Sequence, residues 1–260
     1  MTFVLKLLMA PVLIAVATLA GRRWGPGVSG WLIGFPFISA PISMILAIEN
    51  GPAFAAQAAT GTLGGQACVC LFSTAYLIAA HKFSWWFSAP LAILAFFGCA
   101  VLWSAFSIAL LPALALLLVL AILLLVLVPR ETIRRSAARA PWWDVPARMI
   151  IAVVFVAALT HAASTIGPQR SGLFSAFPIM GTILACFTHA QQGSRAVTSL
   201  LRGSILGSFA IAAFYLVVGV VLPFSGNMLT YLLAAVASIL AGGITLRYAN
   251  SDRAISRPQE

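Results

Sequence analysis

The side chains that could take part in chemistry are few, and the most informative of them follow a Phe-Pro pair. Behind Phe35-Pro36 come Ser39 and Ser43, and Glu49 stands thirteen residues after the proline. Proline removes a backbone hydrogen-bond donor and so leaves carbonyl oxygens of the preceding turn unpaired. Freed carbonyls and small hydroxyls in an apolar segment could coordinate a small polar substrate or an ion. The alternative is a kinked packing helix whose carbonyls are satisfied by neighbouring helices.

The same pattern returns 142 residues later. Phe177-Pro178 is followed by Thr182 and His189, and Gln191 takes the place of Glu49. A carboxylate at a helix mouth could bind a proton or a cation, because ionisable groups near an apolar zone are costly and often functional. The alternatives are a solvated Glu49 in a short turn and a hydrogen-bonded or snorkelling His189.

An internal duplication explains this recurrence. The two copies align without a gap, and the matches include glycine and proline, which mark special backbone geometry. We therefore interpret the chain as two related units. The residues that recur at this offset are Gly25, Pro26, Ser29, Gly30, Phe35, Pro36, Gly51, Gly61 and Gly65.

The composition is that of a membrane protein. Of the 260 residues, 62% are hydrophobic and 8% are charged, whereas soluble domains carry about 25% charged residues. The net charge of +10 then concerns topology and lipid, so we expect no nucleic-acid partner. The four cysteines lie in apolar runs without metal-ligand spacing, and no paired carboxylates or nucleophile motif occur. We expect neither an enzyme nor a metal or cofactor site.

The hydrophobic runs predict an all-α polytopic bundle of about nine transmembrane helices. A charge-free stretch of about 45 residues, 83–128, is too long for one span of about 20 residues and predicts two helices. The second of these, which has no counterpart in the other unit, is expected to be a lipid-facing linker. The expected division is a first four-helix repeat at 1–106, a linker helix at 107–128, a basic cytoplasmic loop at 129–145, a second four-helix repeat at 146–247 and a cytoplasmic tail at 248–260.

Basic residues predict the orientation. With nine spans, Lys6 and Arg170 lie on one side and the other 13 of the 15 basic residues lie on the opposite side. By the positive-inside rule the N-terminus is then outside and the C-terminus cytoplasmic. Four helices plus one linker would place the second unit upside down, which makes the duplication an inverted repeat. Eight spans would need 83–128 to cross only once.

Two further features predict contacts rather than chemistry. Gly61 and Gly65 repeat as Gly203 and Gly207, a spacing that lets helix backbones approach closely within the chain or in a homo-oligomer. The loop that joins the units is rich in arginine and tryptophan, which is typical of a segment on an anionic lipid surface, with an ordinary cytoplasmic loop as the alternative. Its arginines are Arg130, Arg134, Arg135 and Arg139.

These motifs carry a family resemblance. Each unit resembles the small four-helix inner-membrane proteins of the bacterial GlpM type. The shared pattern is Gly30, Phe35-Pro36, Glu49 and Gly51 in the first unit and Gly172, Phe177-Pro178, Gln191 and Gly193 in the second, with Lys6 as an early basic residue. The resemblance implies an inner-membrane location and a helical fold but no reaction. Gln191 departs from it where an acidic residue would be expected.

The sequence therefore leads to two hypotheses. The first is a small secondary transporter of a bacterial cytoplasmic membrane, because inverted repeats with interrupted helices are a recurring plan of such proteins. Pro36 and Pro178 would form the breaks, and Glu49 would be a coupling or gating residue. The second is a membrane protein that assists the assembly or regulation of a partner and docks through its Gly-x-x-x-Gly faces.

Overall fold

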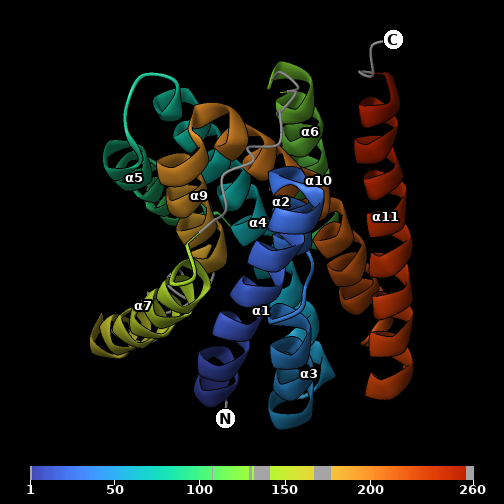
Figure 1. The fold of residues 1–260 in the computed structure, drawn as a ribbon. Coiled ribbons are helices and arrows are strands. Elements are labelled where there is room, and N and C mark those ends of the chain that lie inside the picture. The colour runs from blue at the N-terminus through green and yellow to red at the C-terminus, as the bar shows by residue number, and fades with distance from the viewer. Residues whose placement is uncertain (1, 107, 129–130, 132–140, 167–176, 256–260) are drawn as a thin grey trace.

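The computed structural model describes residues 2–106, 108–128, 131, 141–166 and 177–255, and within these ranges it contains ten helices and no strand. The helices form a bundle in which the start of α1 and the end of α11 lie at opposite ends of the view in Figure 1. The helices are α1 (Thr2–Trp24), α2 (Pro26–Ile33), α3 (Ser39–Asn50), α4 (Pro52–Ala80), α5 (Trp85–Ser104), α6 (Leu110–Leu127), α7 (Asp144–Ile166), α9 (Ile179–Gln192), α10 (Ser194–Val221) and α11 (Asn227–Ile255).

Five of the described helices are long and apolar enough to cross a membrane: α4, α5, α6, α10 and α11. The chain is therefore compatible with a multi-pass membrane protein. The most apolar of the five is α6, with a mean hydropathy of 3.2. Helix α11 continues to Ile255, beyond the start of the polar tail expected from residue 248. The arginines expected to meet anionic lipid, at 130, 134, 135 and 139, lie outside the described residues.

The helix expected around Pro36 is interrupted. Instead of one helix from residue 29 to 48, α2 ends at Ile33 and α3 begins at Ser39, with Pro36 between them. The carbonyl oxygen of Pro36 accepts the first backbone hydrogen bond of α3, from Ala40 at 2.8 Å. Proline lacks the amide hydrogen that a continuous helix would need at this point, so the break follows from the sequence.

Helix boundaries recur at the offset of 142 residues. α1 and α7 cover equivalent residues, α4 and α10 begin at equivalent positions, and so do α5 and α11. The turns before α4 and α10 are alike as well, because Gly51 has a φ of 89° and Gly193 a φ of 82°. Only glycine adopts such angles without strain. Pro178 repeats the role of Pro36, since its carbonyl accepts a backbone bond from Thr182 at 2.9 Å.

The middle of the bundle is built around α4 and α10, which pack against each other. Gln66 of α4 donates a hydrogen bond to Ser208 of α10 at 2.8 Å. Helix α6 packs against both helices through one face and exposes the rest, so the helix expected to be a linker also contributes to the core. Its buried residues are Ala113, Leu117, Ala121 and Leu124.

Helix α2 lies against α10 at very short range. A Cβ atom added to Gly30 would overlap the carbonyl oxygen of Leu200, and one added to Gly203 would overlap the carbonyl oxygen of Gly27. Such glycine contacts let helix backbones approach closely and are a common basis of helix association in membranes. This packing fixes the C-terminal end of α1 and the start of α2 beside α9 and α10, where the polar site lies.

Candidate functional site: a polar cavity between α1, α7 and α9

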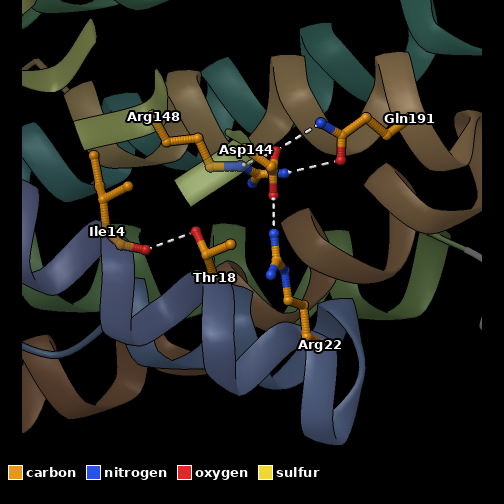
Figure 2. A network of polar contacts seen from close by, with 6 residues as sticks. All are labelled: Ile14, Thr18, Arg22, Asp144, Arg148 and Gln191. Atoms are coloured by element: carbon orange, nitrogen blue, oxygen red, sulfur yellow. Dashed lines mark hydrogen bonds and ion pairs between the residues drawn. The ribbon is translucent and has the colours of Figure 1, made fainter. Parts of the chain in front are cut away.

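Asp144 is the centre of a charged network (Figure 2). Its Oδ2 accepts a hydrogen bond from Nη2 of Arg22 at 2.8 Å, and its Oδ1 accepts one from Nε of Arg148 at 2.9 Å. Gln191 completes the arrangement, with its Nε2 donating to Asp144 Oδ1 at 2.6 Å and its Oε1 accepting from Arg148 Nη2 at 3.3 Å. We call these four residues the Asp144 network.

Three helix ends bring the network together. Asp144 is the first residue of α7, and Arg148 follows one turn later on the same face, the spacing at which helical side chains meet. Arg22 is in the last turn of α1, and Gln191 is near the end of α9. A carboxylate at a helix N-terminus and a guanidinium at a helix C-terminus both oppose the helix dipole favourably. Local helix electrostatics thus support the same arrangement as the ion pairs.

The centre of the network is removed from solvent, whereas its outer members are exposed. The side chains of Asp144 and Arg148 are 1% and 4% exposed, that of Arg22 is 36% exposed, and Gln191 is exposed as well. Asp144 lies in the loop expected at 129–145, before the first span of the second repeat. Burial acts to raise the pKa of this carboxyl, but hydrogen bonds from Gln191, Arg22 and Arg148 outweigh it and hold the pKa below its ordinary value. Asp144 is therefore an anion at neutral pH.

A cavity of about 40 Å³ opens beside the network. It lies between α1, α2, α7, α9 and α10, and most of the residues around it are charged or polar. We call it the α1/α7/α9 cavity. The residues around it are Thr18, Gly21, Arg22, Pro26, Ser29, Asp144, Arg148, Thr188, Gln191, Gln192 and Leu200.

The wall contains two hydroxyl groups that have no hydrogen-bond partner among the described residues. They belong to Ser29 and Thr188, residues that are each 3% exposed, and neither oxygen is among the fully buried unpartnered atoms, so both retain some accessible surface. Thr18, in contrast, donates to the carbonyl oxygen of Ile14 at 2.7 Å. Because polar groups inside proteins are normally hydrogen-bonded, a cavity lined by these two hydroxyls is suited to hold water or a small polar ligand.

Of the residues that the sequence singled out, Gln191 alone belongs to the Asp144 network. Glu49, its equivalent in the first unit, is exposed at the end of α3. Thr182 is buried in α9 and donates to the carbonyl oxygen of Pro178 at 2.9 Å. His189 lies 3.5 Å from the hydroxyl oxygen of Tyr76 and does not line the cavity. The hydrogen-bonded alternative for His189 thus matches its position.

The other predicted residues lie elsewhere in the bundle. The hydroxyls of Ser43 and Tyr231 are 2.8 Å apart and join α3 to α11, and Ser39 is the first residue of α3. Gly207, like Gly203, lies directly against α2 of the same chain. Gly61 is exposed, with no atom within 4 Å of a Cβ placed on it. The predicted residues therefore do not form one site.

Sequence reasoning missed Arg22, Asp144 and Arg148 as members of a site. The distribution of basic residues places the two arginines at the cytoplasmic surface, and the expected division of the chain places Asp144 in the loop at 129–145. A usable signal was present, because an Asp and an Arg four residues apart at the start of an apolar helix form a favourable pair. Their association with Arg22, 122 residues away from Asp144, required the tertiary structure.

The described residues contain no group of three His, Cys, Asp or Glu side chains able to hold a metal ion. Comparison of the chain with protein-family models, with curated proteins and with solved structures finds no match. The function must therefore be inferred from the geometry of this molecule.

Proposed function

We propose that the protein is a small secondary transporter of a bacterial cytoplasmic membrane, built as an inverted repeat with nine spans. One contact carries the proposal. Gln66 and Ser208 occupy equivalent positions in the two units, 142 residues apart, and they are hydrogen-bonded to each other. Equivalent residues of two copies meet where a twofold axis passes between them. Such an axis relates the units of many transporters with inverted repeats.

The interrupted helix supports the same proposal. Transporters of this kind place breaks in their helices where non-helical backbone can line a cavity. The chain leaves helical structure between α2 and α3 at Pro36, and α9 begins directly after Pro178. Breaks at equivalent positions in two inverted units would give each side of the membrane its own gate.

The charged network agrees with the orientation derived from the basic residues. In the nine-span arrangement, the end of α1, the start of α7 and the end of α9 all lie on the cytoplasmic side. These ends meet in the Asp144 network. The α1/α7/α9 cavity would then be an entrance on the cytoplasmic side, with the N-terminus of the chain outside and the C-terminus inside.

A topology map tests this proposal. Dual reporters that distinguish periplasm from cytoplasm would be fused after Arg23, Phe106, Arg139 and Pro168 and at the C-terminus. We expect a cytoplasmic signal at Arg23, Arg139 and the C-terminus, and a periplasmic signal at Phe106 and Pro168. The same signal at Arg23 and Pro168 would make the units parallel and remove the inverted repeat.

A role as an assembly or regulatory partner is a second candidate, and one observation favours it. Gly61 of α4 is open, whereas its equivalent, Gly203, is covered by α2. An open small-residue face could receive a helix of a partner or of a second copy. Gly61→Leu would then break a complex and leave solute uptake unchanged. As a transporter the protein would instead lose uptake when its gates are altered, for example in Glu49→Gln, without losing its fold.

A further inference from the structure

The α1/α7/α9 cavity carries an excess of positive charge. Among the described residues that line it, Arg22 and Arg148 are cations and Asp144 is the one anion. The formal charge of the wall is therefore +1. Arg148 and Asp144 form a buried neutral pair, so the excess charge belongs to Arg22, whose side chain is 36% exposed. A ligand with a single negative charge would neutralise this site. A cation would meet two guanidinium groups and be repelled.

The cavity also offers hydrogen-bond donors that the Asp144 network does not use. A guanidinium has five N–H donors, and the network engages one nitrogen of Arg22 and two of Arg148. Ser29 and Thr188 are buried residues of the same wall, and their hydroxyls make no hydrogen bond among the described residues. Guanidinium and hydroxyl donors in one small space are the usual means by which proteins hold anions.

The size of the cavity limits the ligand. Its volume is about 40 Å³, whereas roughly 10–15 Å³ in the same measure holds one water molecule. The cavity therefore has room for a small anion, or for the charged group of a larger ligand that extends out of it. Multivalent anions are disfavoured, because they would exceed the single positive charge and approach the carboxylate of Asp144.

We propose that the α1/α7/α9 cavity is a binding site for a small singly charged anion, held by Arg22, Arg148, Ser29 and Thr188. The anion would be the cargo or the coupling ion of the transporter proposed above, and this last step rests on that proposed function. Two sources share this chemistry: a free inorganic anion and the phosphodiester group of a phospholipid, which could reach Arg22 through its exposed part.

Chloride is the probe for a free anion. Full-length protein, purified in a phospholipid-free detergent at neutral pH, would be heated in sodium gluconate that is stepwise replaced by sodium chloride at constant ionic strength. A ligand that binds the folded state raises the unfolding temperature in a saturable way. We expect such a rise for the unaltered protein. Short-chain phosphatidylglycerol added in gluconate alone is the second arm and probes the lipid source.

Two matched pairs of variants locate the site. Arg22→Gln should abolish the stabilisation, whereas Arg23→Gln, at the next residue and outside the cavity wall, should retain it. Thr188→Val should weaken the apparent affinity about tenfold, as expected for one hydrogen bond to a charged ligand. Thr198→Val is its control, because Thr198 is equally buried and bonds only to the carbonyl oxygen of Ser194.

Each outcome decides something. Stabilisation by chloride that Arg22→Gln removes supports a free anion, and stabilisation by the lipid alone that the same variant removes supports the phosphodiester. No stabilisation in either arm, or an equal effect in Arg22→Gln, overturns the anion site. Chloride flux into liposomes separates the transporter proposal from the anion-site proposal. Chloride binding without flux supports the site and refutes transport of this anion. Flux of another solute without anion binding refutes the site.

Discussion

At the scale of single residues, Asp144 is the residue on which the polar network and its stability depend most. It holds Arg148, whose side chain is 4% exposed, and Arg22, which reaches it from another helix. A buried ion pair adds little net stability when it forms, but the loss of one partner leaves the other charge buried without compensation. The same carboxylate fixes the two guanidinium groups that face the cavity.

Asp144→Asn should therefore destabilise the protein by about 3 kcal/mol, because the guanidinium of Arg148 remains buried without its counter-charge. The measurement is unfolding in detergent, followed by heating or by denaturant. Glu49→Gln is the matched control, since Glu49 is exposed and belongs to no ion pair within the described residues. An equal effect of the two variants would contradict a structural role of the network.

The difference in stability between the unaltered protein and Asp144→Asn should depend on pH, because the pKa of Asp144 is lowered in the folded state. A carboxyl whose pKa is depressed in the folded state contributes stability above its unfolded value, about 3.8, and loses it as the pH falls through the folded pKa. The gap in unfolding temperature between the unaltered protein and Asp144→Asn should be constant from about pH 5 to about pH 8 and narrow below about pH 4. Narrowing near neutral pH would mean that the pKa is raised instead.

At the scale of helices, glycine decides how closely α2 and α10 approach. Gly30 and Gly203 occupy places where a methyl group would meet backbone atoms of the other helix. Backbone cannot move aside as a flexible side chain can, so the two helices would have to separate. Helix α10 also donates from Arg202 to the carbonyl oxygens of Leu125 and Val128, which satisfies carbonyls at the end of α6.

The equivalent glycines Gly203 and Gly61 offer a matched test at this scale. Gly203→Ala should destabilise the protein by about 1–3 kcal/mol or more, which is the usual cost of overpacking. Gly61→Ala should be neutral or stabilising by up to about 1 kcal/mol, because its site is open and alanine favours helix over glycine. The stabilities of both variants in detergent would be compared. A large loss at Gly61 would show that the face is covered in the folded protein.

At the scale of the whole molecule, the two halves of the chain interlock. Phe35 packs where Gly242 of α11 leaves room, and Phe177 stacks against Phe97 and edge-on against Phe96 in α5. The phenylalanine of each Phe-Pro pair thus packs against a helix of the other half. Neither half buries its own apolar surface completely.

We therefore expect that residues 1–128 do not form a stable protein by themselves and that 129–260 do not either. Co-expression of the two fragments should restore a complex, since helices in a bilayer can form separately and then associate. The readout is co-purification through a tag on one fragment, together with protease resistance. A stable, monodisperse first fragment would contradict the interlocked packing.

The sequence alone determined the helical class, the membrane-like composition and most helix boundaries. These depend on local properties: apolar runs of sufficient length, and proline and glycine at Pro36, Gly51 and Gly193, whose effects on the backbone need no partner. The long apolar run at about 52–80 predicts one helix, and α4 spans Pro52–Ala80. The offset of 142 residues is likewise a property of the sequence.

Only the tertiary structure decided which polar residues form a site. Arg22, Asp144 and Gln191 come from three segments far apart in the chain, and no local pattern states that the ends of α1, α7 and α9 meet. Glu49 and Gln191 are equivalent in sequence and both are exposed, yet Gln191 alone of the two belongs to the Asp144 network. The reason is physical: a side chain's partners, and with them its charge state and role, are set by packing between helices.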